Sequence, residues 1–296
     1  MKRRSALSRR MDLVLGSNGV NPMPAETPWL ERIVRAKRAE LEQARGQAPQ
    51  SVLEKRIAPR PPGTFRRALL SQGTNQSDLA VIAELKQASP SKGTLCAQYE
   101  PAVIARSYAQ AGARALSVLT DREFFHGSLE HLREAKAAAW LPVLRKDFTI
   151  AEYHLYEAAA AGADAVLLIV AILDPPELDR LLNLSRTLGL DSLVEVHTEN
   201  ELQIALDAGA DLVGVNNRDL KTFEVSLDTS FRLIERIPEP VVVVSESGLR
   251  TAEDLERLRA AGFDAFLMGE RFMTEPDPGA ALARLLAEVT ARAAVR

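Results

Sequence analysis

Short apolar runs alternate with charged segments along most of the chain, from residue 79 onward. The runs are nearly continuous in valine, isoleucine and leucine, which is typical of parallel strands covered by helices. In the segments between them, apolar residues recur at helical spacing among charges. The expected strands are residues 79–86, 115–120, 141–148, 164–170, 191–197, 211–217, 240–247 and 263–269, and the expected helices are 101–111, 128–139, 151–161, 174–188, 199–208, 227–236 and 250–261.

Eight strand–helix alternations in succession predict an α/β protein with a single (β/α)8 fold, the TIM barrel. A weak internal repeat supports this prediction. An Ala-Gly pair ends a helix at Gly112, Gly162, Gly209 and Gly262, and a glycine suits the left-handed residue that closes a helix. The alternative is an open doubly wound sheet. It is less well supported, because no Gly-x-Gly-x-x-Gly turn follows the first strand.

The chain before the first strand predicts an extra N-terminal helical segment. Residues 29–44 have an amphipathic helical pattern, and a second short helix is expected at 64–70. The first ten residues are basic and carry no acid, and they lack the apolar stretch of a secretory signal. We expect residues 1–26 to be a disordered basic extension, with a targeting peptide as the alternative, and residues 27–296 to form the barrel with its N-terminal helices.

Composition narrows the possible partners. Hydrophobic residues make up 46% and charged residues 26% of the chain, and the formal net charge is −3, so nothing favours nucleic acid or an anionic membrane as a partner. No apolar run approaches the roughly 20 residues that span a bilayer. Cys96 is the single cysteine, which excludes an internal disulfide and is compatible with a reducing compartment. The four histidines lack a convincing metal-ligand spacing.

Charged residues stand at the carboxyl ends of several expected strands, where barrels place their catalytic groups. Glu84 and Lys86 share one parity at the end of the first strand, and Ala83 and Leu85, with the other parity, suit the helical layer. The charged pair should therefore enter the barrel mouth, because charge inside a strand is costly unless it is paired or used. A purely structural ion pair is the alternative.

Later strand ends carry three more polar candidates. Lys146 shares the parity of the apolar Leu144 and should point inward, where a partly desolvated lysine near another cation has a lowered pKa and can donate a proton. Glu195, between two valines, is expected on the lumen side with His197. Pairing with a neighbouring lysine is its structural alternative and does not exclude catalysis. Asn216 could hydrogen-bond a substrate.

The last two strand ends predict a phosphate site. Small residues around Gly248 and Gly269 precede helical segments, so backbone N–H groups can approach an anion there. Barrels often bind phosphate through these two loops. The alternative is that both glycines only serve tight turns. Nearby, Arg218 could hold an anion or pair with Asp219.

Six motifs in order resemble those of the indole-3-glycerol phosphate synthase family. Each motif is moderately specific alone, but six at the ends of successive strands are strongly specific. The resemblance runs from about Thr27 to the C-terminus. The motifs are residues 82–86 continuing to 89–93, 116–121 with 124–127, 144–148, 193–197, 214–220 and 245–249.

The resemblance implies a reaction without cofactor or metal. The substrate would be 1-(2-carboxyphenylamino)-1-deoxyribulose 5-phosphate, which closes its ring with loss of carbon dioxide and water to give indole-3-glycerol phosphate. By the same resemblance, Lys146 matches a general acid, Glu195 a base, and Lys86 a lysine near the substrate carboxylate. Glu84 and Asn216 match orienting groups. Ser89, Phe125, Phe148, Arg218, Glu246 and Leu267 match substrate-binding positions, and Ser247, Gly248, Gly269 and Glu270 match phosphate-binding positions.

Two departures and two rival functions accompany the resemblance. Glu270 is acidic beside the expected phosphate, so its side chain should turn away, and the basic extension lies outside the match. Helix 29–44 matches an N-terminal segment expected to cover the barrel mouth. The first rival is another phosphate-binding barrel enzyme, such as a sugar-phosphate isomerase or a Schiff-base aldolase, and the aldolase would form a borohydride-trappable adduct on Lys86 or Lys146. The second is a non-catalytic barrel that binds a metabolite or partner protein and would not need these lysines. We expect a monomeric cytoplasmic enzyme that binds a sugar phosphate, with neither nucleic acid nor membrane as partner.

Overall fold

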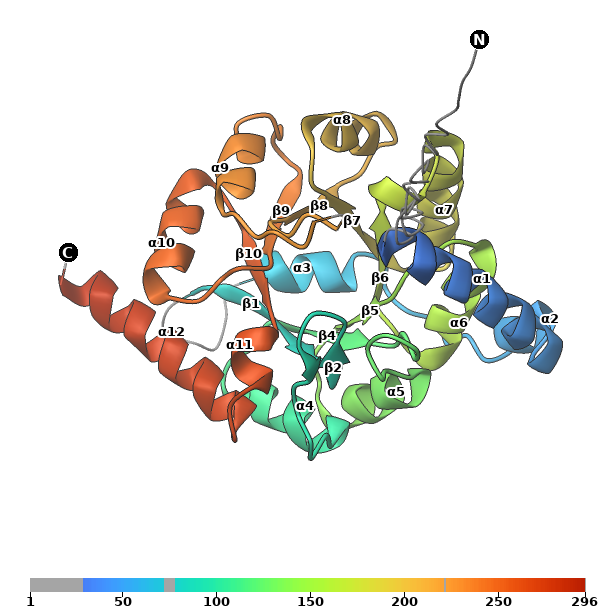
Figure 1. Cartoon of the computed structure of the whole chain (residues 1–296), viewed down its shortest axis with the longest axis horizontal. Coiled ribbons are helices and arrows are strands. Elements are labelled where there is room, and N and C mark those ends of the chain that lie inside the picture. Colours follow the sequence, from blue (N-terminus) through green and yellow to red (C-terminus); the bar gives the residue numbers. More distant parts are fainter. Residues whose placement is uncertain (1–28, 72–77, 221, 296) are drawn as a thin grey trace, which may run out of the picture.

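Eight parallel strands close into a barrel in the computed structural model, which describes residues 29–71, 78–220 and 222–295 (Figure 1). The predicted (β/α)8 fold is thereby confirmed. The expected basic extension, residues 1–26, lies outside the described residues. In order around the barrel, the strands are β1 (Ala80–Leu85), β10 (Ala265–Met268), β9 (Val242–Glu246), β8 (Leu212–Asn216), β7 (Asp191–Val196), β6 (Ala165–Ile169), β5 (Val143–Lys146) and β4 (Ala115–Leu119).

Helices form the outer ring. Seven of them lie where the helical periodicity predicts them, and the last, residues 278–295, was not predicted. A two-stranded hairpin of β2 (Ala88–Ser89) and β3 (Gly93–Thr94) after β1 was not predicted. The ring helices are α4 (Pro101–Gln110), α5 (Leu129–Ala138), α6 (Glu152–Ala161), α7 (Pro175–Thr187), α8 (Glu199–Asp207), α9 (Asp228–Ile234), α10 (Ala252–Ala261) and α12 (Pro278–Val295), with the short α11 (Glu270–Met273) and the 3-10 turn η1 (Val170–Ile172) between strands and helices. No helix in the described ranges is both long and apolar enough to cross a bilayer.

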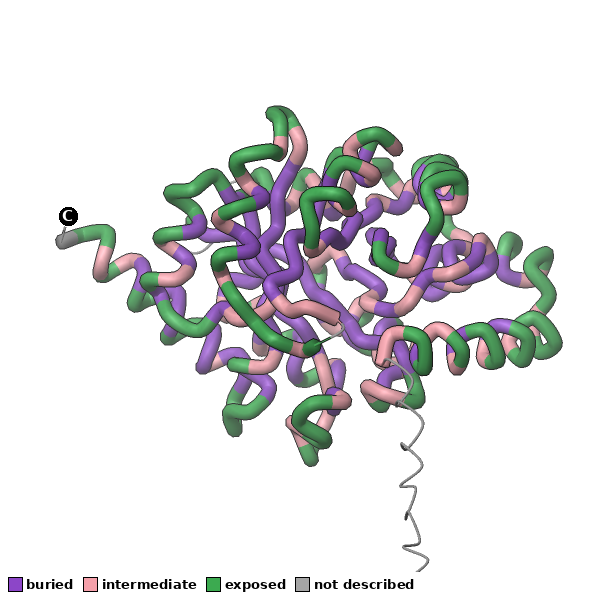
Figure 2. The backbone as a smooth tube through the Cα atoms, turned by 45° about the horizontal axis from the view of Figure 1, so that its top comes forward, coloured by how far each residue is buried: buried purple, intermediate pink, exposed green. Residues whose placement is uncertain are grey.

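Strand parity divides the core into two layers. In β1, Ala80 and Ile82 belong to a cluster inside the barrel, whereas Val81, Ala83 and Leu85 pack outward against the helices. The strands are buried and the exposed residues lie mainly on the outer helices and loops (Figure 2). Burying one such aliphatic side chain contributes roughly 1.5–3 kcal/mol. Because of the same alternation, the last inward-facing residue of a strand points into the barrel mouth.

Helix α3 (Thr64–Leu70) closes the amino-terminal end of the barrel. Its Phe65 and Leu69 are buried and join the cluster inside the barrel. The Asp191 carboxylate, at the start of β7, accepts the Arg66 backbone N–H at 2.9 Å and fixes the helix to the rim. Figure 1 shows α3 crossing the centre of the ring. Because Phe65 and Leu69 fill the interior at this end, the barrel interior leaves room for a ligand at the carboxyl ends of the strands.

Helix α1 (Trp29–Gln47) extends three residues beyond its predicted end and lies on the outside beside α6 and α2 (Gln50–Glu54) (Figure 1). Leu41 of α1 is buried together with Tyr153 of α6. The Tyr153 hydroxyl lies 2.9 Å from the Ala44 carbonyl oxygen and 2.7 Å from that of Ala48, so it can donate to the end of α1. These contacts fix one end of α1 to the ring, while its first turn reaches the barrel mouth.

Candidate active site

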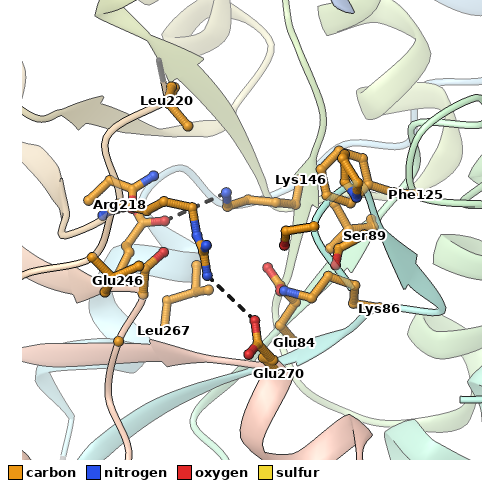
Figure 3. A pocket seen from close by; sticks show the side chains of 18 of the residues that line it. Glu84, Lys86, Ser89, Phe125, Lys146, Arg218, Leu220, Glu246, Leu267 and Glu270 are labelled. Atoms are coloured by element: carbon orange, nitrogen blue, oxygen red, sulfur yellow. Dashed lines mark hydrogen bonds and ion pairs between the residues drawn. The ribbon is translucent and has the colours of Figure 1, made fainter. Parts of the chain in front are cut away.

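A cavity of about 550 Å³ opens at the carboxyl ends of the strands. Its volume suits one small-molecule ligand. Every barrel strand contributes an inward side chain to its lining, and the first turn of α1 contributes Trp29, Leu30 and Ile33 at the rim. The resemblance implied that helix 29–44 covers the mouth, but only the first turn of α1 lies at the rim, because the later part of the helix packs against α6. Figure 3 shows the charged groups of the lining converging on the same space.

Lys146, the last residue of β5, stands among carboxylates. Its Nζ lies 3.4 Å from Glu195 Oε2 and 3.6 Å from Glu246 Oε2. Burial alone would lower the pKa of Lys146, but the carboxylates of Glu195, Glu246 and Glu84 outweigh burial and raise it. The expectation of a lowered pKa was wrong, because these three acids, rather than a second cation, surround the ammonium group. Lys146 therefore carries its proton at neutral pH.

The Glu84–Lys86 pair enters the mouth as its strand parity predicts. Lys86 Nζ lies 2.6 Å from Glu84 Oε1, and both residues line the cavity. Burial acts to raise the pKa of Glu84, but the ammonium groups of Lys86 and Lys146 outweigh it, so that the pKa is lowered. Glu84 is thus an ionised carboxylate held between two lysines. The pair is structural in geometry and also faces the ligand space.

Glu195 is fixed in place by Asn216, the last residue of β8. Asn216 Nδ2 donates to Glu195 Oε1 at 3.1 Å, and Asn216 Oδ1 accepts the Arg218 backbone N–H at 3.0 Å. The amide orientation is therefore set by a donor on one side and an acceptor on the other. His197 does not join Glu195 in the lining, because its Nδ1 lies 2.7 Å from the Asn216 carbonyl oxygen instead.

Glu246, at the end of β9, is a buried carboxyl group with incomplete hydrogen bonding. Among the described residues its Oε1 has no hydrogen-bond partner. Burial raises the pKa of Glu246, Lys146 opposes this, and the negative charges of Glu195 and Glu84 raise it further. Gly214 of β8 makes room for the group, since a Cβ there would lie 2.1 Å from Glu246 Oε1. Glu246 is therefore a neutral acid near the ionised Glu84.

The loops after β9 and β10 bring small residues to the mouth. Gly248 has a φ of +77°, and a Cβ there would lie 2.6 Å from Val225 Cγ1. A Cβ on Gly269 would lie 2.6 Å from Glu84 Oε1. Close packing therefore requires glycine at both positions, which agrees with the alternative that the two glycines only serve tight turns. They also line the cavity next to Ser247 and Glu270, so the turn geometry leaves room for a ligand beside the backbone.

Glu270 does not turn away from the mouth. Its carboxylate lies 3.5 Å from Arg218 Nη2 and 4.0 Å from Lys92 Nζ, and Figure 3 shows the first of these contacts as a dashed line. The expectation that the side chain would point elsewhere was wrong, because two cations of the β8 and β1 loops attract it. Arg218 was expected to hold an anion or to pair with Asp219. In the structure its guanidinium lies near the carboxylate of Glu270.

Phe125 and Phe148 form an apolar wall of the cavity. The Phe125 and Phe148 rings lie 6.2 Å apart at 39°, and Leu267 lines the cavity as well. Ser89 Oγ is buried there without a hydrogen-bond partner among the described residues. A ligand with one flat apolar part and several anionic or hydroxyl groups matches such a lining.

The structure brings together all of the site residues predicted from the sequence. Sequence reasoning missed further lining residues, among them Leu167 and Ile169 of β6, whose inward parity could have revealed them. In the described part of the chain no cluster of His, Cys, Asp and Glu is arranged to hold a metal ion. The predicted residues that line the one cavity are Glu84, Lys86, Ser89, Phe125, Lys146, Phe148, Glu195, Asn216, Arg218, Glu246, Ser247, Gly248, Leu267, Gly269 and Glu270.

Known proteins resemble this chain over most of its length. The family model of indole-3-glycerol phosphate synthase matches residues 30–285. The indole-3-glycerol phosphate synthase of Polaromonas sp. (strain JS666) is 50% identical over 260 residues, which are 86% of this chain and 97% of that protein. That of Carboxydothermus hydrogenoformans is 44% identical over 264 residues, 88% of this chain and all of that protein (100%).

Two solved structures show the same fold at low sequence identity. Thiamine phosphate pyrophosphorylase from Pyrococcus furiosus superposes with a TM-score of 0.54 at 16% identity, over 72% of this chain and 96% of that one. A mandelate oxidase superposes with a TM-score of 0.57 at 16% identity, over 82% of this chain and 83% of that one. At such identity the likeness concerns the barrel alone.

Proposed function

The chain belongs to the indole-3-glycerol phosphate synthase family, and from this premise we propose how the residues of its cavity divide the work of the reaction. The reaction closes the ring of 1-(2-carboxyphenylamino)-1-deoxyribulose 5-phosphate with loss of carbon dioxide and water, in tryptophan biosynthesis. The enzyme is a carboxy-lyase that acts on a small phosphorylated substrate. The observation that carries our assignment is the Lys146 ammonium between Glu195 and Glu246 within one cavity.

Lys146 is the general acid for ring closure in this proposal. The aromatic carbon that bears the carboxylate attacks the ketone carbon, and the carbonyl oxygen becomes a hydroxyl by taking a proton. An ammonium group that the surrounding carboxylates keep charged is available at neutral pH as that donor. Glu195, 3.4 Å from Lys146 Nζ, would later pass to the lysine the proton that it takes up in the dehydration step.

Lys86 faces the carboxylate that leaves as carbon dioxide. A cation beside it offsets the negative charge of the substrate on binding, and the Glu84 carboxylate 2.6 Å away fixes the ammonium position. When the carbon–carbon bond breaks, its electron pair restores the aromatic ring and carbon dioxide departs neutral. Dehydration then removes one hydroxyl and one proton, and Glu195, oriented by Asn216, is the base that we assign to it.

The remaining lining residues bind the two ends of the substrate. Phe125, Phe148 and Leu267 would hold the aromatic ring, with Ser89 and Glu246 beside it. The loops that carry Ser247, Gly248, Gly269 and Glu270 would hold the phosphate through backbone N–H groups, with the Arg218 guanidinium nearby. This division leaves the Glu270 carboxylate as the counterion of Arg218 and gives its backbone to the anion.

We further propose that the enzyme works as a cytoplasmic monomer without cofactor, metal, nucleic acid or membrane. A net charge of −3 supports this, since a polyanionic partner would meet no overall attraction. Residues 27–296 would form one domain, a barrel with its N-terminal helices, preceded by the extension 1–26.

A direct test mixes the purified chain with the carboxyphenylamino sugar phosphate and follows indole fluorescence. Fluorescence is expected to rise without added metal or nucleotide. In Lys146→Ala, kcat is expected to fall by about 100- to 10,000-fold, the usual contribution of a positioned proton donor. Retained turnover in that variant would contradict the assignment of Lys146. Borohydride quenching during turnover is expected to leave Lys86 and Lys146 unmodified, whereas an aldolase-type adduct would support the Schiff-base rival.

A further inference from the structure

A lysine outside the barrel lies at the centre of a buried ion cluster directly behind the active site. Lys37, on α1, is 1% exposed. Its Nζ lies 2.7 Å from Glu40 Oε2, 2.9 Å from Asp121 Oδ2 and 2.8 Å from Asp147 Oδ1. All three protons of the ammonium group thus have an acceptor. Lys37 does not line the cavity, so the proposed function leaves this cluster unexplained.

Asp121 organises the loop after β4. Its Oδ1 accepts the Phe124 backbone N–H at 2.9 Å, and its own carbonyl accepts the Gly127 N–H at 2.7 Å. Phe125, which forms part of the apolar wall, lies inside this turn. The position of the Phe125 ring therefore depends on where the Asp121 carboxylate is held, and Lys37 holds it.

Asp147 organises the end of β5 in the same way. It follows Lys146 directly and precedes Phe148, whose backbone N–H it accepts at 2.8 Å. Its second oxygen accepts the Thr120 hydroxyl at 2.6 Å and Arg145 Nη2 at 3.1 Å. Every lone-pair direction of this buried carboxylate is occupied. Burial acts to raise the pKa of Asp147, but the cations of Lys37 and Arg145 lower it well below its usual range.

We propose that Lys37 is a positioning residue that sets the distance between the proposed proton donor and the apolar wall. One ammonium group holds two carboxylates, and each carboxylate holds a loop of the site: Asp121 the loop of Phe125, Asp147 the strand end of Lys146 and the wall residue Phe148. The inference rests on the proposed roles of these residues. It makes α1 part of the catalytic apparatus, because the cation that joins the two loops comes from outside the barrel.

The test compares two lysine ion pairs at opposite ends of β5, the buried pair of Lys37 and the half-buried pair of Lys136. Lys37→Met removes the cation at the carboxyl end. Lys136→Met is the matched control, because Lys136 Nζ lies 2.6 Å from Asp164 Oδ2, and that same oxygen accepts the Val143 N–H at the amino end of the strand. Both variants lose an ion pair that orders β5. Each is assayed for kcat and KM at a temperature where circular dichroism shows it fully folded.

Lys37→Met is expected to lower kcat/KM by about 100-fold, the effect of a displacement of about 1 Å in a catalytic group. Lys136→Met is expected to lower the melting temperature and leave kcat/KM unchanged. Equal kcat/KM in both folded variants would overturn the inference. Lys146→Ala is assayed in parallel. If it is inactive and Lys37→Met does not differ from Lys136→Met, only the positioning role is rejected. If Lys146→Ala retains activity, the proposed function is rejected.

Two milder variants keep the test decisive if Lys37→Met does not fold. Asp121→Asn leaves Lys37 with Asp147 and Glu40, so it loosens only the Phe125 loop and is expected to raise KM with kcat retained. Lys37→Arg keeps the charge but changes the donor geometry at both carboxylates, and a fall in kcat is expected. If both variants keep wild-type kcat and KM, the positioning role is rejected. Glu40→Gln, at the solvent side of the cluster, is expected to leave both constants unchanged.

Discussion

At the residue scale, the carboxyl groups of Glu84 and Glu246 act on the same lysine, Lys146, and differ in protonation. Glu84 lies 2.6 Å from Lys86 Nζ and is influenced by Lys146 as well, so two cations keep it ionised. Glu246 meets only Lys146, at 3.6 Å, and one of its oxygens has no hydrogen-bond partner in the described part of the chain. Number and distance of cations, rather than residue type, thus decide which carboxyl is charged.

Glu246→Gln is expected to remove a pH-dependent loss of stability. The folded state raises the pKa of Glu246, so between the ordinary carboxyl range and that raised pKa only the unfolded chain is ionised, and stability falls as pH rises. Gln keeps the neutral shape. One unit of pKa difference corresponds to about 1.4 kcal/mol, so the variant should gain at least about 1 kcal/mol over wild type on going from about pH 5 to about pH 8.

Urea unfolding at several pH values measures this difference. Glu195→Gln, which removes another carboxyl group of the same cavity, serves as the comparison. A Glu246→Gln variant whose stability runs parallel to wild type across the range would show that Glu246 is ionised in the folded protein.

Strand parity, at the scale of elements, predicted much of the site. Glu84 and Glu195 were assigned to the barrel mouth because their apolar neighbours of the opposite parity suit the helical layer, and Lys146 because it shares the parity of Leu144. All three side chains line the cavity. The pKa of Lys146 could not be predicted in this way, because Glu84, Glu195 and Glu246 lie on other strands and only barrel closure brings them to it. The Lys37 cluster was not predicted for the same reason, since its members are distant in sequence.

Phe65→Ala tests whether α3 supports the barrel from below without touching the chemistry. The Phe65 ring is fully buried within the cluster inside the barrel, so its removal should lower the free energy of unfolding by about 3–5 kcal/mol. The KM of the folded variant should not change, since Phe65 lies at the end opposite the cavity. Denaturant unfolding and steady-state kinetics measure the two quantities.

Leu70→Ala is the matched control for α3, because the Leu70 side chain is 53% exposed. Little change in stability is expected there. A small effect of Phe65→Ala, similar to that of Leu70→Ala, would mean that the barrel interior does not depend on α3.

At the scale of the whole molecule, a buried charge network contributes to the response to acid. Asp147, Arg145 and Lys37 share one cluster, and the imidazole of His154 is buried beside it. Burial and the nearby Arg145 cation together lower the pKa of His154 to about 3. Their effect outweighs that of the Asp147 carboxylate, which acts to raise it. His154 is therefore neutral in the folded protein, and its Nδ1 accepts the Ile150 N–H at 3.2 Å.

His154→Asn is expected to flatten the loss of stability in acid. The folded pKa lies below the unfolded value of about 6.5, so stability is fully present above that value and is lost as pH falls towards about 3. Asn can still accept the Ile150 N–H but does not titrate. Over that window the wild type should lose up to about 1.4 kcal/mol per pH unit more than the variant, as measured by thermal or urea unfolding.

His126→Asn is the control for His154→Asn, because His126 is exposed in the β4 loop. It should leave the acid limb of the stability curve as it is in wild type. Parallel acid limbs for wild type and His154→Asn would mean that His154 is protonated in the folded protein.

The seal that α3 makes beneath the barrel has a consequence for turnover. Phe65 and Leu69 fill the far end, and the cavity opens on the side bordered by Trp29 and the strand-end loops. Substrate therefore enters, and carbon dioxide and the indole product leave, on this side of the barrel. Bound product occupies the cavity that the next substrate molecule needs, so product is expected to inhibit competitively.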